Sequence, residues 1–239
     1  MAAVIERIFR ASRGTYGSPR VYKAMKNQGM KVGRKRVERL MREAGLRARA
    51  IRHYRRVPAL HRFFDSIENR RLETDKATAV NQQWVGDITF IRVNKRWCYL
   101  STVMDLYSRR IVSWSLHKSR STTLTTAALV KAIKRRRPAP GLLFHTDRGS
   151  EYRSYEVQAV LQKYGVVPSM NRPYRSVDNA EMESFFKTLK GDVIRGKKYR
   201  SFRALRRDLS SYINHFYNPK RLHSSLGYRS PVEFEAMQC

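Results

Sequence analysis

The stretch WVGDITFIRVNKRWCYLSTVMDLYSRRIVSWSLHK, residues 84–118, decides the fold. It contains three short apolar runs, at 84–93, 97–106 and 109–118. Turn-forming pairs join them, Asn94-Lys95 and Tyr107-Ser108. Short strands with tight connections are typical of an antiparallel meander. We therefore predict three consecutive antiparallel strands in this part of the chain.

Helical and strand patterns alternate after the meander. We predict helices at 122–137, 156–164 and 178–190, and strands at 142–147 and 166–170. This order predicts an α/β domain at 81–191, in which further strands extend the meander and helices flank it. A basic helical extension follows at 192–239, with a helix near 202–215.

The N-terminal residues 1–50 predict a small helical domain. One helix is expected from Ser18 to about Asn27, and a second from about Gly33 to Ala44. Three basic residues, Arg34, Lys35 and Arg36, crowd the start of the second helix, as in a DNA-binding helix-turn-helix, and are candidate DNA contacts. A basic helical hairpin that only packs on its neighbour is the alternative. Residues 51–80 are interpreted as a basic linker, with a short helix near 63–72.

The overall charge points to a polyanionic partner. The 239 residues carry a formal net charge of +31 at pH 7, and such a chain repels itself unless a polyanion neutralises it. DNA or RNA fits this requirement, and a ribosomal or RNA-packaging protein remains an alternative. The two cysteines form no disulfide or metal-binding pattern, and neither a signal peptide nor a membrane span is recognisable. We expect a cytoplasmic protein with no membrane partner.

Two aspartates stand where a functional site is expected. Asp87 lies within the apolar run 84–93 and shares a strand face with Val85, Thr89 and Ile91. A carboxylate buried there needs a proton, a salt bridge or a metal ion. Asp147 ends a predicted strand, and ligands in α/β sheets usually bind at the carboxyl ends of strands.

Helix geometry selects a third acid. In the helix predicted at 178–190, four apolar residues form the buried stripe: Met182, Phe185, Phe186 and Leu189. Glu183 falls on one flank of this stripe with Lys187 and Lys190, whereas Glu181 falls on the opposite flank. We therefore choose Glu183 for the site, with the two lysines beside a phosphate backbone, and interpret Glu181 as a solvated first-turn acid.

The acids Asp87, Asp147 and Glu183 suit hard cations. Carboxylates without a set of His or Cys ligands favour Mg²⁺, for which Mn²⁺ can substitute. Two such ions can serve in-line phosphoryl transfer at a nucleic-acid phosphate. The alternative treats the three acids as scattered salt-bridge partners of nearby arginines.

Other polar residues receive structural interpretations. Asp105 is expected to stabilise the turn after its strand and to pair with an arginine. Asp178 and Asn179 are interpreted as helix-capping residues, and Glu151 is expected to be exposed beyond a glycine turn. His145 shares a face with Asp147, but a lone histidine is more often structural than catalytic.

Long motifs connect these residues with a known family. They are RGTYGSPRVYKAM (13–25), VGRKRVERLMREAGL (32–46), DITF (87–90), YLSTVMDLYSRRIVSW (99–114), HTDRGSEY (145–152), SMNRPYRSVDNAEMESFFKTLK (169–190) and YINHFYNPKRLHSSLGYRSP (212–231). With these motifs the chain resembles the DDE transposases encoded by the second reading frame of a large group of frameshifting bacterial insertion sequences. Those proteins share their catalytic core with retroviral integrases. The 35 residues between Asp147 and Glu183 also match the family spacing.

The resemblance implies an RNase H-like core with a small N-terminal helix-turn-helix domain. It implies two Mg²⁺ ions at Asp87, Asp147 and Glu183, and DNA strand cleavage followed by strand transfer. Double-stranded DNA is the implied substrate, bound by a homo-oligomer in the bacterial nucleoid. The candidate DNA contacts are Arg34, Lys35, Arg36, Arg148, Lys187 and Lys190.

The sequence also departs from the family pattern. Gly86 replaces the Thr or Ala often found before the first acid, and Glu151 replaces a usual Gln. Members often act as a frameshift fusion with an upstream product, which is therefore an expected partner. A catalytically silent, transposon-derived DNA-binding regulator and a ribonuclease of the same fold are the alternatives to the transposase. The terminal repeat, the target preference and the oligomeric state do not follow from the sequence.

Overall fold

The computed structural model describes residues 1–48, 67–172 and 176–237, with the side chains of 176 and 177 left aside. Most of the predicted linker 51–80 therefore lies outside the described residues. Of the short helix expected near 63–72, the structure describes the last part, a 3-10 turn at Arg70–Leu72. No helix of the described part is both long enough and apolar enough to cross a bilayer.

A five-stranded mixed sheet forms the centre of the molecule. Its strands lie in the order β3-β2-β1-β4-β5. Their bounds are β1 Gln83–Val93, β2 Arg96–Asp105, β3 Ile111–His117, β4 Leu143–Thr146 and β5 Val167–Met170. The first three strands pair antiparallel, and β4 pairs parallel with both β1 and β5. The predicted meander, extended by two parallel strands, is confirmed.

The turn between β1 and β2 is as tight as its sequence suggests. Asn94 and Lys95 both have positive φ, 42° and 65°. This left-handed backbone matches the twist of a two-residue hairpin, and asparagine adopts it more readily than most residues. The turn fixes the pairing of Val93 with Arg96, and the register continues unbroken to the pair Trp84 and Asp105.

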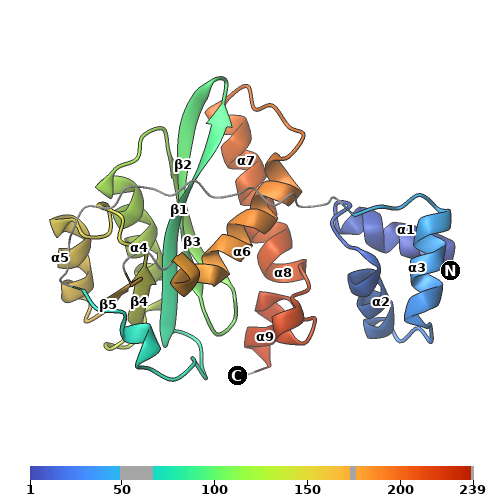
Figure 1. Cartoon of the computed structure of the whole chain (residues 1–239), viewed down its shortest axis with the longest axis horizontal. Helices are drawn as coiled ribbons and strands as arrows, with labels where there is room; N and C mark the ends of the chain where they lie inside the picture. The colour runs from blue at the N-terminus through green and yellow to red at the C-terminus, as the bar shows by residue number, and fades with distance from the viewer. Residues whose placement is uncertain (49–66, 173–175, 238–239) are drawn as a thin grey trace.

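Helices cover both faces of the sheet (Figure 1). On one face, α4 (Thr122–Arg136) and α5 (Tyr155–Lys163) pack around the buried Trp84 and Phe144. On the other face, α6 (Ala180–Leu189) and α7 (Phe202–Tyr212) enclose a second apolar core. Strand alternation explains the two cores, because neighbouring residues of β1 point to opposite faces.

The N-terminal domain has three helices rather than two. The predicted pair is present as α2 (Ser18–Asn27) and α3 (Arg34–Glu43), and α1 (Ala2–Ala11) precedes it. Val37 and Met41 of α3 are buried against this small core. The three basic residues at the start of α3 are exposed, as a DNA-reading helix requires.

The C-terminal segment is more helical than its sequence suggested. α7 continues through a wide turn at Ile213–Tyr217 into the short α8 (Asn218–Lys220), and α9 (Pro231–Ala236) follows. This segment contacts the N-terminal domain: the Tyr16 hydroxyl accepts a hydrogen bond from the Leu222 amide at 2.8 Å, and Arg221 donates to the Thr15 hydroxyl at 3.3 Å. The segment therefore touches both the core and the N-terminal domain.

A buried ion pair stabilises the C-terminal segment. Arg221 and Asp192 lie 3.0 Å apart, and each side chain is only 5% exposed. The Tyr212 hydroxyl donates a further hydrogen bond to Asp192 at 2.7 Å. Burial of two charges is tolerated when each finds partners, and this cluster provides them.

Candidate active site

The sheet topology brings Asp87 and Asp147 to neighbouring positions. Gly86 of β1 lies opposite Thr146 of β4 in parallel register, so the two aspartates follow directly on adjacent strands. Both side chains are half-buried. A backbone amide orients each carboxylate: Ile88 donates to Asp87 Oδ1 at 2.7 Å, and Gly149 donates to Asp147 Oδ1 at 3.0 Å.

The loop after β4 requires glycine at 149. A Cβ at this position would lie 2.9 Å from Asp147 Oδ1 and 3.2 Å from Glu151 Oε2. A side chain here would displace one of the two carboxylates. The glycine therefore lets the loop backbone approach and orient Asp147.

Helix α6 runs beside β1 and carries Glu183 along it. At its start, the Asn179 side chain donates to the Gly86 carbonyl at 3.3 Å, and at its end the Lys190 ammonium lies 4.8 Å from the Phe90 ring centroid. Glu183 lies between these two contacts. The predicted apolar stripe is confirmed, because its four residues are all buried.

The charge of Asp87 also affects the pKa of Lys190. Burial lowers its pKa, and the negative charge of Asp87 acts in the opposite direction. Lys187, one turn earlier, is exposed. The flank of α6 that carries Glu183 thus has two lysines, of which Lys190 is half-buried and Lys187 is exposed.

The three acids do not form a closed metal cluster. Within residues 1–48, 67–172 and 176–237, no three His, Cys, Asp or Glu side chains lie together in an arrangement that holds a metal ion. The donor chemistry of Asp87 and Asp147 nevertheless fits a hard divalent cation, because two carboxylates follow the paired residues Gly86 and Thr146 on adjacent strands.

An arginine that the sequence reasoning missed stands beside Asp147. Arg120 Nε lies 2.5 Å from Glu151 Oε1, and its Nη2 donates to Oε2 at 2.9 Å. Burial acts to lower the pKa of Arg120, but the hydrogen bond and charge of Glu151, together with the charge of Asp147, raise it. The expectation that Glu151 is exposed is wrong: this residue is 7% exposed because its carboxylate folds inward onto Arg120.

Tyr152, in the loop after β4, is a buried tyrosine. Tyr152 is 3% exposed and packs edge-on against Phe144. Burial raises its pKa well above the ordinary value, and the charges of Asp87 and Asp147 raise it further. The hydroxyl therefore stays protonated beside both aspartates.

Glu181 is not the solvated acid that was expected. Its carboxylate pairs with Arg71 Nη2 at 2.5 Å and lies 3.5 Å from Arg109, and its side chain is 19% exposed. Burial acts to raise the pKa of Glu181, but the hydrogen bond and charge of Arg71 outweigh it and lower the pKa. The prediction failed because Arg71 approaches from a segment more than a hundred residues away in the chain.

The capping interpretation of Asp178 and Asn179 is confirmed in position for Asn179 but not in its hydrogen bonds. Asn179 occupies the N-cap position of α6 but makes no side-chain cap bond, since its amide contacts the Gly86 carbonyl instead. Asp178 accepts bonds from Arg172 and from the Asn69 side chain. These bonds lower the pKa of Asp178 to about 2, with the Arg172 hydrogen bond as the main cause. The Asn179 side chain thus contacts β1, and the Asp178 carboxylate holds Arg172 and Asn69, rather than the helix end.

His145 and Arg148 have structural roles. His145 is fully buried between Ser169 and Asn171, at 2.9 Å and 2.7 Å, and does not turn toward the aspartates. Arg148 donates to the backbone carbonyls of Asn171 at 2.6 Å and Ile67 at 3.0 Å. These bonds connect the segment after β5 with Ile67, and the assignment of Arg148 as a DNA contact stays a prediction.

Asp105 holds its turn as predicted. Its carboxylate accepts bonds from the backbone amides of Tyr107 at 3.0 Å and Ser108 at 3.1 Å. It also accepts from the Asn81 amide and the Trp84 indole. The role is therefore structural, at the opposite end of β2 from the hairpin turn.

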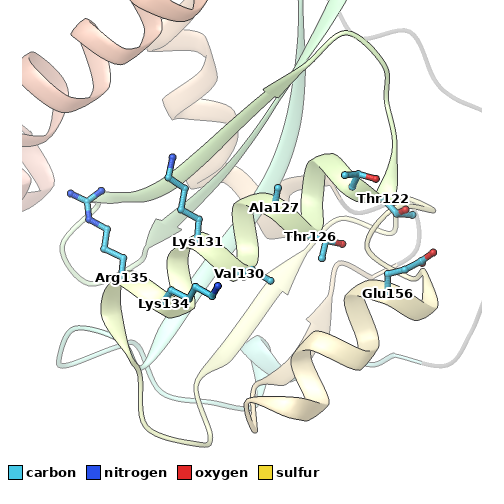
Figure 2. A pocket seen from close by; sticks show the side chains of 9 residues that line it. Thr122, Thr126, Ala127, Val130, Lys131, Lys134, Arg135 and Glu156 are labelled. Atoms are coloured by element: carbon cyan, nitrogen blue, oxygen red, sulfur yellow. The ribbon is translucent and has the colours of Figure 1, made fainter.

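A separate groove lies along α4 (Figure 2). It has a volume of about 920 Å³, and threonines, aliphatic residues and basic residues of α4 line it together with Glu156 of α5. With one carboxylate and no paired aspartate, this groove lacks the donors of the site at Asp87.

Comparison with protein families places these features in a known class. The integrase core domain matches residues 77–176, and a second integrase core description matches 164–231. An HTH-like domain matches residues 1–56. The chain is thus an integrase-type polynucleotidyl transferase core preceded by an HTH-like domain.

Relatives that match nearly the whole chain are transposases of bacterial insertion sequences. The transposase for insertion sequence element IS904 of Lactococcus lactis is 37% identical over 97% of this chain and 91% of its own length. Transposase InsF of insertion sequence IS3A in Escherichia coli is 36% identical over 98% of this chain and 81% of its own length. The chain belongs to this family of insertion-sequence transposases.

Solved structures support the fold. The simian T-cell lymphotropic virus intasome in complex with the PP2A subunit B56 gamma aligns with a TM-score of 0.57, at 18% identity, over 89% of this chain and 69% of the viral chain. The HTLV-2 integrase catalytic core in complex with magnesium aligns with a TM-score of 0.50, at 19% identity, over 66% of this chain and 98% of that chain. The predicted RNase H-like core is confirmed.

Proposed function

We propose that this transposase cuts and joins DNA strands at Asp87, Asp147 and Glu183, with two Mg²⁺ ions that Mn²⁺ can replace. The observation that carries this proposal is the register of β1 and β4, which sets Asp87, within β1, beside Asp147, which follows the end of β4. The related integrase core that was solved with magnesium supports the choice of metal. Glu183, on the helix beside β1, supplies the third carboxylate when metal and DNA bind.

Bound metal would activate the attacking oxygen and stabilise the leaving one in an in-line displacement. The chain's own groups prepare the site. The amides of Ile88 and Gly149 each hold one oxygen of an aspartate, which orients the two carboxylates. Lys190, beside Asp87, offers a positive charge to the phosphate backbone, and Lys187 extends this charge to the exposed side. Arg120 adds a cation on the Asp147 side.

Duplex recognition is assigned to the N-terminal domain. Arg34, Lys35 and Arg36 stand exposed at the start of α3, where a recognition helix presents its side chains to the major groove. We propose a division into a DNA-binding domain at 1–50, a basic linker at 51–80, the catalytic core at 81–191 and a basic helical extension at 192–239. Action as a homo-oligomer on paired element ends, with an upstream-frame protein as partner, is part of the proposal.

The test compares matched variants of neighbouring acids. Wild type, Glu183→Gln and Glu181→Gln are incubated with labelled element-end DNA and Mg²⁺ or Mn²⁺, with the upstream-frame product supplied. Wild type and Glu181→Gln should nick the DNA only with metal, because Glu181 serves Arg71 and not the site. Glu183→Gln should lose nicking and keep DNA affinity, because it removes a negative charge near phosphate.

A second readout separates metal binding from turnover. Calorimetric titration with Mn²⁺ should show binding to wild type that Asp87→Asn and Asp147→Asn weaken strongly. Tight DNA binding without nicking by wild type under every condition would instead support the catalytically silent regulator. Nicking that survives Glu183→Gln would refute the role given to Glu183.

A further inference from the structure

The far end of the β1–β2 hairpin carries an aromatic pair in the open. Phe90 is 54% exposed and Trp97 is 47% exposed. Their ring centroids are 5.1 Å apart and the rings meet edge-on at 88°. Large aromatic side chains left in solvent as a pair are uncommon unless they serve a partner.

Strand alternation explains why this face is free. Thr89, Ile91 and Val93 are buried on the face toward α6 and α7. Phe90 and Arg92 point to the other face, and Trp97 lies opposite Arg92 in the β2 register. β4 pairs with β1 only over Gln83–Gly86, so this part of the hairpin projects past the parallel strands.

Cations accompany both rings. The Lys190 ammonium lies 4.8 Å from the Phe90 centroid, and the Arg92 guanidinium lies 5.8 Å from the Trp97 centroid. Residues 88–99 include three basic residues and no acidic one. Aromatic rings interleaved with cations provide stacking surfaces for bases and charges for the phosphates between them.

The aromatic pair lies near the acids of the proposed active site. Phe90 is three residues beyond Asp87 on the same strand, a distance of roughly 10 Å along an extended chain, and its side chain points to the opposite face of the sheet. Lys190 connects the two places, since it stands at the end of the helix that carries Glu183 and contacts the Phe90 ring. Because β4 pairs with β1 only as far as Gly86, a strand with a phosphate at Asp87 can follow Lys190 around this edge to the rings.

We propose that Phe90 and Trp97 form a stacking platform for unpaired nucleobases of the DNA strand adjoining the cleaved phosphate, with Arg92 and Lys190 on its backbone. This inference rests on the proposed function. The platform would favour ends whose last base pairs have opened, because a paired base has no free face to stack on. Charge complementarity favours single-stranded DNA over a second copy of this basic chain.

The test measures binding without catalysis. Affinities for oligothymidylate, for an abasic oligomer of equal length, and for forked and blunt duplexes are measured in EDTA. Phe90→Ala and Trp97→Ala should each raise the Kd for oligothymidylate about tenfold, since a stacked base contributes roughly 1–3 kcal/mol. Trp97→Phe should keep near-wild-type affinity. Tyr155→Ala removes an aromatic that is 84% exposed on α5 and should change nothing.

Four readouts make the stacking interpretation specific. Abasic oligomer should bind wild type and both alanine variants equally, and the salt dependence should not change, because no charge has been removed. Thymine binding should quench Trp97 fluorescence, whereas the fully buried Trp84 should be insensitive. Wild type should prefer forked over blunt duplex, and the alanine variants should lose that preference.

Two outcomes would overturn the platform. One is an equal loss of affinity for thymidylate and abasic oligomers, which would show a merely structural effect. The other is a dimer without DNA that Trp97→Ala converts to a monomer, which would assign the rings to a second copy of the chain. Because nicking is measured separately, failure of metal-dependent cleavage and failure of base stacking are distinguishable.

Discussion

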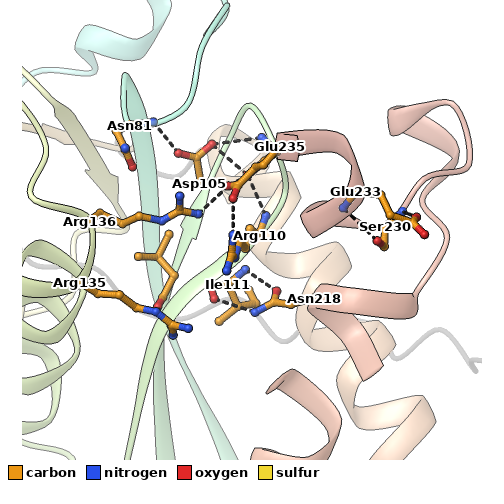
Figure 3. Close-up of polar contacts among 12 residues, drawn as sticks. Asn81, Asp105, Arg110, Ile111, Arg135, Arg136, Asn218, Ser230, Glu233 and Glu235 are labelled. Atoms are coloured by element: carbon orange, nitrogen blue, oxygen red, sulfur yellow. Dashed lines mark hydrogen bonds and ion pairs between the residues drawn. The ribbon is translucent and has the colours of Figure 1, made fainter. Parts of the chain in front are cut away.

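The carboxylate of Glu235 fastens α9 to the sheet, and its replacement by glutamine should destabilise the whole protein. Figure 3 shows Glu235 facing Arg110 and Arg136 across the gap between α9 and the core. Arg136 lies 2.5 Å from Oε1, the Ser108 hydroxyl donates to the same oxygen at 2.7 Å, and Arg110 donates to Oε2. One side chain thus joins α9, α4 and the turn before β3.

The magnitude follows from these contacts. Breaking a buried pair by removing one charge costs roughly 3–5 kcal/mol. Glutamine keeps an acceptor for Ser108, and the Arg110 and Arg136 side chains are 25% and 16% exposed, so water can partly replace the lost partner. We therefore expect a loss of about 3 kcal/mol in the free energy of unfolding, at the lower end of that range. For a chain of this size the melting temperature should fall by about 6–12 °C.

Urea denaturation of wild type, Glu235→Gln and Glu233→Gln provides the assay. Glu233 lies on the same helix but caps it, accepting from the Ser230 amide at 2.8 Å, and its replacement should cost at most about 1 kcal/mol. A double variant with Arg136→Met should lose less than the sum of its single changes, because the unpaired arginine is gone. A Glu235→Gln loss no greater than that of Glu233→Gln would refute the reasoning.

Burial acts to raise the pKa of Glu235, but the hydrogen bonds from Arg136, Ser108 and Arg110 outweigh it and lower the pKa. The stabilisation is therefore present above the ordinary glutamate pKa and is lost as the pH falls through the lowered value. Stability measured against pH should show this acid loss in wild type. The loss should be smaller in Glu235→Gln.

Three further predictions concern the site and the core. Gly149→Ala should reduce metal-dependent nicking and Mn²⁺ affinity while the protein stays folded, because the new Cβ would lie 2.9 Å from Asp147 Oδ1; unchanged metal affinity would contradict this. Burial lowers the pKa of His145 to about 4 in the folded protein, whereas an unfolded chain binds this proton near pH 6.5. The free energy of unfolding should therefore fall by about 3 kcal/mol between pH 6.5 and pH 4. His145→Gln should remove this pH dependence. Asp192→Asn leaves Arg221 buried without its counter-charge and should cost roughly 3–5 kcal/mol in urea titrations, whereas a change below about 1 kcal/mol would show that the tyrosine hydroxyl suffices.

The local parts of the fold were predictable because short-range rules govern them. Alternation along 84–93 and the Asn94-Lys95 pair specify a hairpin whose register the structure reproduces. The period of α6 identified its buried stripe, because burial of a helix depends on residues within two turns. One local signal was overlooked: Ser230, Pro231 and Glu233 form a capping box with proline at the first turn, which predicts α9.

Contacts between distant segments were not predictable in the same way. Glu151 and Glu181 were expected in solvent, yet Arg120 and Arg71 draw them inward from segments far away in sequence. The residues next to an acid in the sequence do not show which distant arginine will pair with it. Asp87 and Asp147 were expected near each other, and their strands β1 and β4 are neighbours in the sheet. This could be predicted because strand order follows from the regular alternation of helices and strands.

The contacts of Tyr16 and Arg221 have a consequence for the order of synthesis. The N-terminal domain is made first, but its brace at Leu222 and Arg221 belongs to the final part of the chain. During translation the N-terminal domain is therefore synthesised long before the residues that it contacts in the C-terminal segment. A nascent chain that ends before residue 221 therefore lacks these contacts, and only a longer chain holds the N-terminal domain through Thr15 and Tyr16.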